Sequence, residues 1–499
     1  MNTAVHAVAL PLIGAFLLPV LWRAAGRVST VLGPLILLTS TIILACQWNN
    51  FTSPSVIAIG GFAPPLGISF YLDEIALLFA AIAPLMALIL WPGGSDEAAI
   101  RKQSLTLLLV AATAGLAMSG DLFNLYVFYE LAAVASYGLA ASKGTGAGYA
   151  ASFRYLIISS VGSVFALLGV AIVYFNTGTL NLAHLASMSD ALNNIEGLAA
   201  FILLAIGFGV KAELFPVNAW VPEVYAATTS RVSALLAGLV SKLAVLVILR
   251  FLLLVFPFDE AREILLILGT LGVITGELAA WRARDMARML AWSSIGQLGL
   301  IFIAFSIPGE AGIIAGLAIA LHHLVVKPAL FLLAERWKGS LDSLTGAAAV
   351  SPLGGILFVL FALSLLGLPP LPGFWAKLLL LTGLMDSGVA LASTVLAIVL
   401  VALVIEASYL ARVISKMYSP KPSHNPPQRH SLLNLTTATA FAALLLVAVF
   451  NTNNIWQSLT DMARMTKVIP SYSTVTTSGK TLGYTSKPSI ESSKEMNNG

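Results

Sequence analysis

Charged residues are scarce in this sequence, where Asp, Glu, Lys and Arg together make up 10% of 499 residues. A typical soluble domain is about one quarter charged. Hydrophobic residues reach 58%, and runs of about 20 apolar residues, long enough to cross a bilayer core of about 30 Å, recur along the chain. The composition excludes a soluble globular protein and predicts an all-α polytopic membrane protein.

Cysteine is almost absent, and so are the motifs of nucleotide and metal chemistry. The single cysteine, Cys46, lies in an apolar run, which excludes a disulfide framework and a cysteine metal site. No Walker-type loop, dinucleotide fingerprint or CxxC pair occurs, and the glycine-rich 144–150 segment "GTGAGYA" lies between two predicted spans with no strand before it. We therefore expect no cofactor, no metal and no enzymatic activity of its own. An ion gradient or partner subunits must drive the protein.

Hydropathy and turn signals predict about fourteen membrane spans. No cleavable signal is evident at the N-terminus, so the first apolar run is taken as the first span. The predicted spans lie near 4–22, 29–47, 73–91, 104–119, 122–141, 151–175, 197–227 (broken), 229–254, 262–281, 289–306, 311–334, 352–384 (broken), 389–415 and 432–450.

The basic residues support this count through their distribution. With an outside N-terminus, the inside loops hold sixteen of the 27 Lys and Arg, whereas the outside loops hold only Arg250 and Arg262. The net charge of +4 thus follows membrane topology and gives no sign of nucleic-acid binding. Both termini are expected outside the membrane of a bacterial cell. The Ser/Thr-rich tail, 453–499, is expected to be disordered because it has little to bury.

Four lysines fall inside predicted spans: Lys211, Lys242, Lys327 and Lys377. An ionisable residue in a membrane interior costs several kcal/mol unless it is paired or hydrated, and it marks a functional site by default. The alternative is snorkelling, in which a lysine near a helix end reaches the headgroups. That alternative fits poorly for Lys242, about 13 residues into its span, and for four lysines together. The set predicts a proton relay, because desolvated lysine titrates readily.

Acids and a histidine complete the predicted relay. Glu130 lies mid-span without a lysine near it on its own helix, so we expect it to pair with Lys211 from another helix. His323 stands one helical turn before Lys327 on the same face.

Three further ionisable residues lie in the predicted spans. His322 points elsewhere and is expected to be a packed hydrogen-bonding residue. Glu213 is expected to tune Lys211 or to line the site. Glu406, deep in the thirteenth span, is either the exit of the row or a partner of Arg412.

Prolines interrupt the seventh and twelfth predicted spans, at Pro216 and Pro222 and in "GLPPLPGFWAK". Irregular backbone at membrane depth is tolerated only where it is buried in protein or lines a wet cavity. Two matching breaks indicate inverted repeats of a transporter, and simple proline kinks are the alternative. The predicted division is an N-terminal three-helix segment (1–100), a first repeat (101–256, spans 4–8), a second repeat (257–418, spans 9–13), a C-terminal helix (419–452) and the tail (453–499).

Six motifs resemble a known family: "GDLFNLYVFYEL", "GFGVKAELFPVNAWVPEVYA", "SALLAGLVSKLAVLVILR", "RDMARMLAWSSIGQLGLIF", "HHLVVKPALFLL" and "GLPPLPGFWAK". The chain resembles the antiporter-like subunits of respiratory complex I and of the Mrp multisubunit cation/proton antiporters, most closely the D-type Mrp subunits. The resemblance spans about 70 to 440 and implies a fourteen-helix core with two inverted five-helix repeats. It departs at "AATTSRVSA", where a proline-rich turn is usual, and at Glu213, where a small apolar residue is usual.

The resemblance also implies roles for the buried residues. Glu130 and Lys211 match the family's fifth-helix glutamate and seventh-helix lysine, and Lys242 its eighth-helix lysine. The eleventh-helix pair is matched by His323 and Lys327, and the twelfth-helix site by Lys377.

The function expected from these matches is that of a proton-translocating subunit of a Na⁺/H⁺ antiporter with other subunits as partners. A proton-pumping subunit of complex I or a membrane-bound hydrogenase is the alternative. A non-transporting scaffold is disfavoured, because it would gain nothing from charges that cost so much in lipid.

Overall fold

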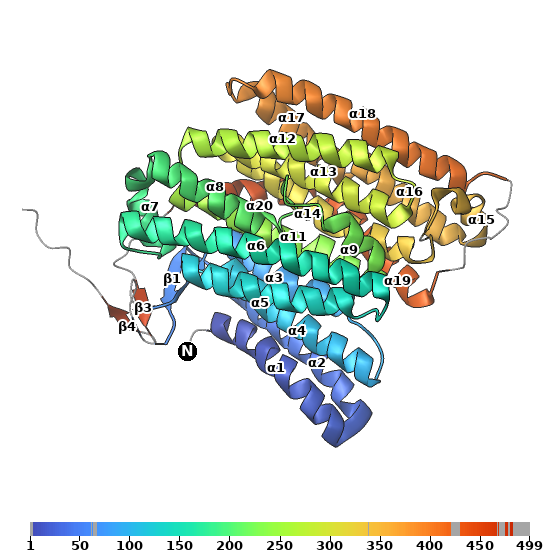
Figure 1. The fold of residues 1–499 in the computed structure, drawn as a ribbon, viewed down its shortest axis with the longest axis horizontal. Coiled ribbons are helices and arrows are strands. Elements are labelled where there is room, and N and C mark those ends of the chain that lie inside the picture. Colours follow the sequence, from blue (N-terminus) through green and yellow to red (C-terminus); the bar gives the residue numbers. More distant parts are fainter. Residues whose placement is uncertain are drawn as a thin grey trace, which may run out of the picture.

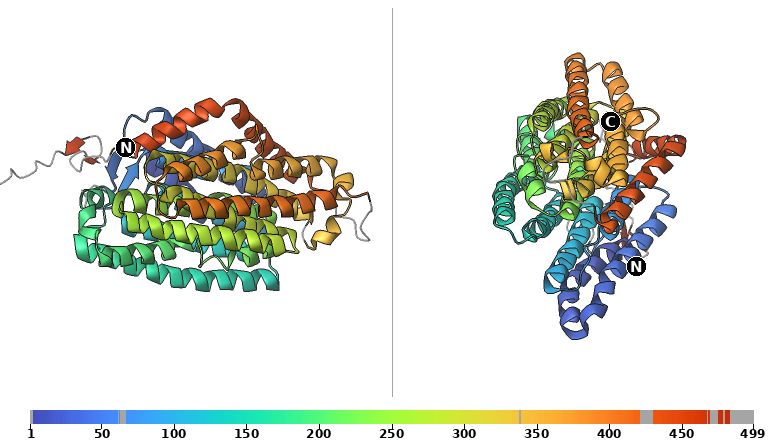
Figure 2. Two further views of the ribbon diagram at one scale, coloured as in Figure 1. Left: turned by 90° about the horizontal axis from the view of Figure 1, so that it is seen from above. Right: turned by 90° about the vertical axis from the view of Figure 1, so that its right-hand side faces the viewer.

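The computed structural model describes residues 3–60, 62, 67–337, 339–420, 430–466, 468, 475–477 and 480–482. Long helices run side by side along the longest axis of the molecule (Figure 1). Viewed along that axis, the N-terminal helices lie at one end of an elongated cross-section and the orange helices of the 352–417 segment lie at the other (Figure 2).

The N-terminal half contains α1 (Thr3–Ala25), α2 (Leu32–Asn49), α3 (Glu74–Ile89), α4 (Glu97–Met118), α5 (Leu122–Ala141), α6 (Gly146–Thr177), α7 (Leu182–Ser187), α8 (Ile195–Gly209), α9 (Val221–Ala227), α10 (Ser230–Leu235) and α11 (Ser241–Arg250). Two π-helical turns, η3 (Leu236–Val240) and η4 (Phe251–Val255), flank α11. Short 3-10 turns lie at η1 (Gly26–Val31) and η2 (Ser189–Leu192).

The C-terminal half contains α12 (Asp259–Arg282), α13 (Met286–Ser306), α14 (Glu310–Leu333), α15 (Ala347–Val350), α16 (Pro352–Leu366), α17 (Pro372–Asp386), α18 (Ala392–Met417), α19 (Leu432–Phe450) and α20 (Thr452–Met465). Two 3-10 turns, η5 (Ala334–Trp337) and η6 (Leu341–Leu344), follow α14.

Each of the fourteen predicted spans coincides with one continuous helical segment or one interrupted pair of helices. Within the described residues, ten segments are long and apolar enough to cross a membrane, and α3, α8 and α16 are shorter apolar helices. The remaining predicted span, 104–119, lies in α4. The prediction of a helical membrane protein is therefore confirmed.

Side-chain caps explain why many of these helices begin where they do. The carboxylates of Asp73, Asp96, Asp121 and Asp285 accept hydrogen bonds from backbone N–H groups in the first turns of α3, α4, α5 and α13. Such caps satisfy N–H groups that have no partner within the helix, and each is worth about 1 kcal/mol. Acidic caps thus fix the start of these four helices, and Thr145, Asn194 and Ser431 do the same for α6, α8 and α19.

Both predicted breaks are present, with one difference in the first. The helix α8 ends at Gly209, and a run of turns reaches α9, whose first turn contains Pro222. Pro222 is therefore accommodated in the first turn of a helix, where a residue needs no partner for its backbone N–H group. Pro216 lies in the interruption itself. In the second break, Gly367 ends α16 in the left-handed region, and Pro372 opens α17.

The prediction of a disordered tail is wrong for two parts of it. Residues 452–465 form α20, which buries Leu459, Met462 and Ala463, and whose Arg464 forms an ion pair with Glu310. Apolar residues at helical spacing among Asn and Thr explain this helix. The strands β3 (Val475–Thr477) and β4 (Lys480–Leu482) join β1 (Ser55–Ala58) and β2 (Ser69–Leu72) in a sheet of order β2-β1-β3-β4. The rest of the predicted tail from 467 on, apart from residue 468, lies outside the described residues.

In that sheet, β1 runs antiparallel to β2, with Val56 opposite Tyr71. The strand β3 runs parallel to β1 and antiparallel to β4. The sheet lies at one end of the helical bundle (Figure 1).

Three segments form the buried centre of the bundle: α10 to η4, α13 and α14. Their side chains are buried almost all round, so they have no lipid-facing stripe of their own. Glycines let α12 approach α13 closely, since a Cβ at Gly276 would lie 2.5 Å from the Gly296 nitrogen. Ionisable residues in the middle of these segments, such as Lys242 and Lys327, are therefore enclosed by protein.

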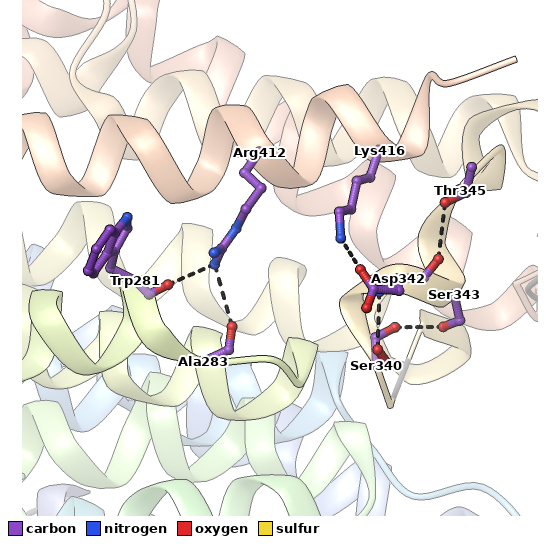
Figure 3. Close-up of polar contacts among 8 residues, drawn as sticks. All are labelled: Trp281, Ala283, Ser340, Asp342, Ser343, Thr345, Arg412 and Lys416. Carbon is purple, nitrogen blue, oxygen red and sulfur yellow. Dashed lines mark hydrogen bonds and ion pairs between the residues drawn. The ribbon is translucent and has the colours of Figure 1, made fainter. Parts of the chain in front are cut away.

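The C-terminal end of α18 is joined to its neighbours by polar contacts (Figure 3). Arg412 donates hydrogen bonds to the backbone oxygens of Trp281, at 2.9 Å, and Ala283, at 3.4 Å, where α12 ends. Lys416 forms an ion pair with Asp342 of η6, and this ammonium holds the pKa of the Asp342 carboxyl below its ordinary value. A cation at a helix C-terminus interacts favourably with the helix dipole.

We expect Arg412→Met to lower the free energy of unfolding by about 1 kcal/mol, because the carbonyls at the α12 C-terminus lose a charged donor. Thermal unfolding of the detergent-solubilised protein measures the change. Lys416→Met is the matched comparison and should shift the midpoint less than Arg412→Met, since Asp342 is solvent-exposed and exposed ion pairs contribute little to stability. Equal effects of the two substitutions would contradict this assignment.

Candidate functional site

The lysine of the first break, Lys211, lies just after the end of α8 and is almost completely buried. Its Nζ donates a hydrogen bond to the Ser159 hydroxyl at 3.1 Å. The same nitrogen lies over the Tyr129 ring, 3.3 Å from its centroid. A hydroxyl and an aromatic face both stabilise a buried ammonium.

Glu130 of α5 does not form the direct ion pair with Lys211 that the sequence suggested. Its carboxylate instead accepts a hydrogen bond from Ser163 of α6. Ser163 and Ser159 lie one turn apart, and Ser159 accepts from Lys211. Two serines of α6 thus stand between the acid and the amine, which still interact electrostatically.

These serines were missed because serine is common in helices that pack closely. The only signal for them was their spacing of four residues in "ISSVGSV", which places both on one helix face.

Glu213 lies in the same turn as Lys211 but faces the other half of the site. Its backbone φ is 56°, in the left-handed region that non-glycine residues rarely adopt. Its carboxylate accepts a hydrogen bond from the Tyr225 hydroxyl at 2.5 Å and interacts electrostatically with Lys242 and Lys327. The electrostatic neighbours of Glu213 are thus the central lysines, and its roles in tuning Lys211 or in lining the site stay predictions.

Lys242 is the second residue of α11, which follows the π-helical turn η3 directly. Its Nζ donates to the Ala237 oxygen at 2.5 Å and to the Ser241 hydroxyl at 3.0 Å. Inserted π-helical turns are frequent at functional sites. Lys242 is 1% exposed, which excludes the snorkelling alternative.

Lys327 and His323 of α14 both contact serines of α13. Lys327 donates to the Ser293 hydroxyl at 2.7 Å and to the Leu290 oxygen at 3.4 Å, and His323 Nε2 lies 3.3 Å from the Ser294 hydroxyl. Among the described residues, His323 Nδ1 is buried without a hydrogen-bond partner.

His322 points in another direction and pairs with Ser364 of α16 at 2.8 Å. This contact is the packed hydrogen bond expected for His322.

Lys377 of α17 and Glu406 of α18 form a buried ion pair with 2.5 Å between Nζ and Oε2. The Gln297 amide donates to the other carboxylate oxygen of Glu406 at 2.8 Å. The alternative that Glu406 pairs with Arg412 is wrong, because Arg412 binds carbonyls at the end of α12. Helix geometry explains this, since residues six apart lie on different faces.

One buried acid beside this pair is not among the residues predicted from the sequence. Glu277 of α12 is 3% exposed and accepts a hydrogen bond from the Tyr409 hydroxyl at 3.0 Å. It interacts electrostatically with Glu406, Lys377 and Lys327. The signal was a carboxylate within the apolar span "LGVITGELAAW".

Together these residues form a row of ionisable groups across the helix bundle, all of them buried except Glu130, which is half-buried. The order is Glu130, Lys211, Glu213, Lys242, His323, Lys327, Glu277, Glu406 and Lys377. Serine or tyrosine hydroxyl groups contact Glu130, Lys211, Glu213, Lys242, His323, Lys327 and Glu277. No cluster of His, Cys, Asp and Glu that could hold a metal ion occurs within the part of the chain that the structure describes.

A polytopic helical bundle with such a row defines an antiporter-like membrane protein. The chain belongs to the NADH:quinone oxidoreductase/Mrp antiporter transmembrane family, whose pattern matches residues 119–405. This finding confirms the resemblance drawn from the sequence motifs.

Relatives within the family are similar over most of their length. NADH-quinone oxidoreductase subunit N of Desulforudis audaxviator is 31% identical over 79% of this chain and 80% of its own. The D-type Na⁺/H⁺ antiporter subunit of Alkalihalophilus pseudofirmus is 30% identical over 70% of this chain and 74% of its own. The corresponding antiporter protein of Bacillus subtilis is 29% identical over 81% of this chain and 84% of its own.

Solved structures show the same fold. A chain of an archaeal membrane-bound sulfane sulfur reductase superposes with a TM-score of 0.87 and 30% identity, covering 95% of this chain and 99% of that one. A chain of the Mrp complex from Dietzia superposes with a TM-score of 0.84 and 25% identity, covering 94% and 98%. Both are chains of multisubunit membrane complexes.

Proposed function

We propose that this protein is the proton-translocating subunit of a multisubunit Na⁺/H⁺ antiporter. The row of buried amines, acids and imidazole supports the proposal best. Charges at this depth cost several kcal/mol each and serve no packing purpose. Relatives named as D-type Na⁺/H⁺ antiporter subunits, at 30% and 29% identity, support the assignment.

In the proposed mechanism, Glu130 and Lys211 form the first gate through the two serines of α6. Loss of the Glu130 charge destabilises the Lys211 ammonium, since an opposite charge nearby favours the charged form. The released proton moves to Lys242, where Glu213 stabilises it.

Beyond Lys242, His323 and Lys327 carry the proton to Lys377 at the far end. There Lys377 accepts and releases the proton, and its ion pair with Glu406 opens and closes as it does so. A pocket of about 320 Å³ lined by Asp259, Arg262 and Glu263 lies at the end of α12 nearest the α17–α18 turn and offers an opening toward the outside.

Two inverted repeats, 101–256 and 257–418, would place one half of this path in each. The matching interruptions between α8 and α9 and between α16 and α17 support this arrangement. We place the protein in a bacterial cell membrane with both termini outside, consistent with the basic residues of the inside loops. Other subunits of the assembly would carry or couple the sodium ion.

A second function, a proton-pumping subunit of a redox-driven complex, is favoured by two observations. The subunit N relative is 31% identical, and the sulfane sulfur reductase chain superposes with a TM-score of 0.87. The same buried residues would then carry protons, but an electron-transfer module would drive them.

Sealed vesicles containing the native assembly distinguish the two functions. We expect a sodium pulse to produce counter-directed proton movement, measured with a pH-sensitive dye trapped inside the vesicles. The movement should persist without any electron donor or acceptor. Proton movement that requires electron transfer and ignores sodium would replace the antiporter proposal with the redox-driven one.

A further inference from the structure

The buried glutamate of α12, Glu277, has no role in the proposed proton path, although it lies among the residues of that path. Glu277 is enclosed where α12 and α13 cross most closely: a Cβ at Gly296 would lie 2.2 Å from Glu277 Oε1. The next residue, Gln297, donates to Glu406. Adjacent positions of α13 therefore contact the two carboxylates, and Glu277 lies beside the Lys377–Glu406 pair.

The charges of this cluster do not balance by themselves. Glu406 has its own counter-ion in Lys377, whereas Glu277 has no cation within ion-pair distance among the described residues. It interacts electrostatically with Lys377, which is already paired with Glu406, and with Lys327. A buried carboxylate without a paired cation is costly, so its charge depends on the protonation of Lys327.

Two hydroxyl groups join Lys327 to Glu277. Lys327 donates to the Ser293 hydroxyl at 2.7 Å. The Ser293 hydroxyl also interacts with the Tyr409 hydroxyl, and Tyr409 donates to Glu277 Oε2 at 3.0 Å. An ammonium can only donate and a carboxylate can only accept. The direction of the chain is thus fixed from Lys327 to Glu277.

We propose that Glu277 is a second proton acceptor of the row, connected to Lys327 by the hydroxyl groups of Ser293 and Tyr409. This inference rests on the proposed proton-translocating function and adds a proton-storing branch to it. Glu277 would hold the proton until the adjacent Lys377–Glu406 pair releases one.

The transfer balances in protons and charge. The Lys327 ammonium gives a proton to the Ser293 oxygen, the serine passes its own proton to the Tyr409 oxygen, and the tyrosine passes its own to the Glu277 carboxylate. Lys327 becomes a neutral amine and Glu277 a neutral acid, while both hydroxyl groups are restored. One buried positive and one buried negative charge disappear together, so the cluster keeps its net charge.

The test uses the complete assembly reconstituted in proteoliposomes. Glu277→Gln keeps the shape and polarity of the side chain but cannot accept the proton, and Tyr409→Phe removes only the hydroxyl. We expect each to reduce the initial proton flux at least about tenfold, in line with the loss of a positioned proton-transfer group. Glu260→Gln and Tyr418→Phe are matched controls on the exposed ends of the same helices and should leave the flux unchanged.

Infrared difference spectroscopy separates proton storage from a packing role. We expect the driving pulse to change the carbonyl band of a protonated carboxyl group in the wild type, and Glu277→Gln to remove that change. An unchanged band together with flux above half of the wild-type value in Glu277→Gln and Tyr409→Phe would overturn the inference.

Lys377→Met in the same preparation keeps the two proposals apart. Flux lost in Lys377→Met but retained in Glu277→Gln would overturn only the branch through Glu277. Flux retained in both would overturn the proposed function as well.

Discussion

Replacement of Lys377 by methionine is expected to abolish proton flux and to lower the free energy of unfolding by about 3–5 kcal/mol. The reason is that Glu406 would keep its buried position but lose its only ion-pair partner among the described residues. Breaking a buried ion pair from one side leaves an uncompensated charge, which costs more than the pair itself contributed.

The double variant Lys377→Met with Glu406→Gln separates stability from function. Both charges are then absent, and the amide introduced by Glu406→Gln can retain a hydrogen bond with Gln297, so the stability should return to near the wild-type value. Proton flux should remain absent, because neither titratable group of the terminal pair is left. Thermal unfolding and dye-reported flux in proteoliposomes give the two measurements.

Two other combinations of stability and proton flux would contradict this role for Lys377. Recovery of flux in the double variant would mean that the pair serves only the fold. A single variant as stable as the wild type would mean that Glu406 is already neutral before the substitution.

Loss of Lys211 is expected to stop the flux as completely, and the two serines of α6 should matter almost as much. Lys211→Met removes the amine of the first gate. Ser159→Ala combined with Ser163→Ala leaves Glu130 and Lys211 in place but removes the hydroxyl groups between them. We expect the double serine variant to lower the flux at least about tenfold.

Initial flux rates at equal amounts of assembled protein measure this effect. Lys143→Met is the matched control, since Lys143 is an exposed lysine outside the helices, and it should not change the rate. Full flux in the double serine variant would show that Glu130 and Lys211 exchange protons without these hydroxyl groups. Full flux in Lys211→Met would remove Lys211 from the row altogether.

Much of the fold could be predicted from the sequence because a bilayer restricts the possible structures. Only segments of sufficient apolar length can cross it, and every backbone group must be satisfied within the segment. The predicted spans coincide with helices for this reason. The prediction was wrong for α20, whose amphipathic pattern is too polar to stand out as a span but suffices for packing against α14.

The candidate lysines could also be found in the sequence, because an ammonium within an apolar run is conspicuous. Their partners could not. The sequence predicted a direct pair of Glu130 with Lys211, whereas in the structure Glu130 accepts a hydrogen bond from Ser163. For Glu406 the sequence left open an exit role or a pair with Arg412, whereas the structure pairs it with Lys377. The sequence does not indicate which helix a serine or an additional glutamate in a span will contact.

The sequence by itself determined the membrane environment, the positions of the helices and the presence of charges at depths where lipid cannot solvate them. These properties depend on composition and spacing along one segment. The tertiary structure decided which donor meets which acceptor, because partner choice depends on the rotation and approach of helices that are distant in the chain. Contacts such as Tyr409 with Glu277 and Gln297 with Glu406 exist only where α12, α13 and α18 pack together.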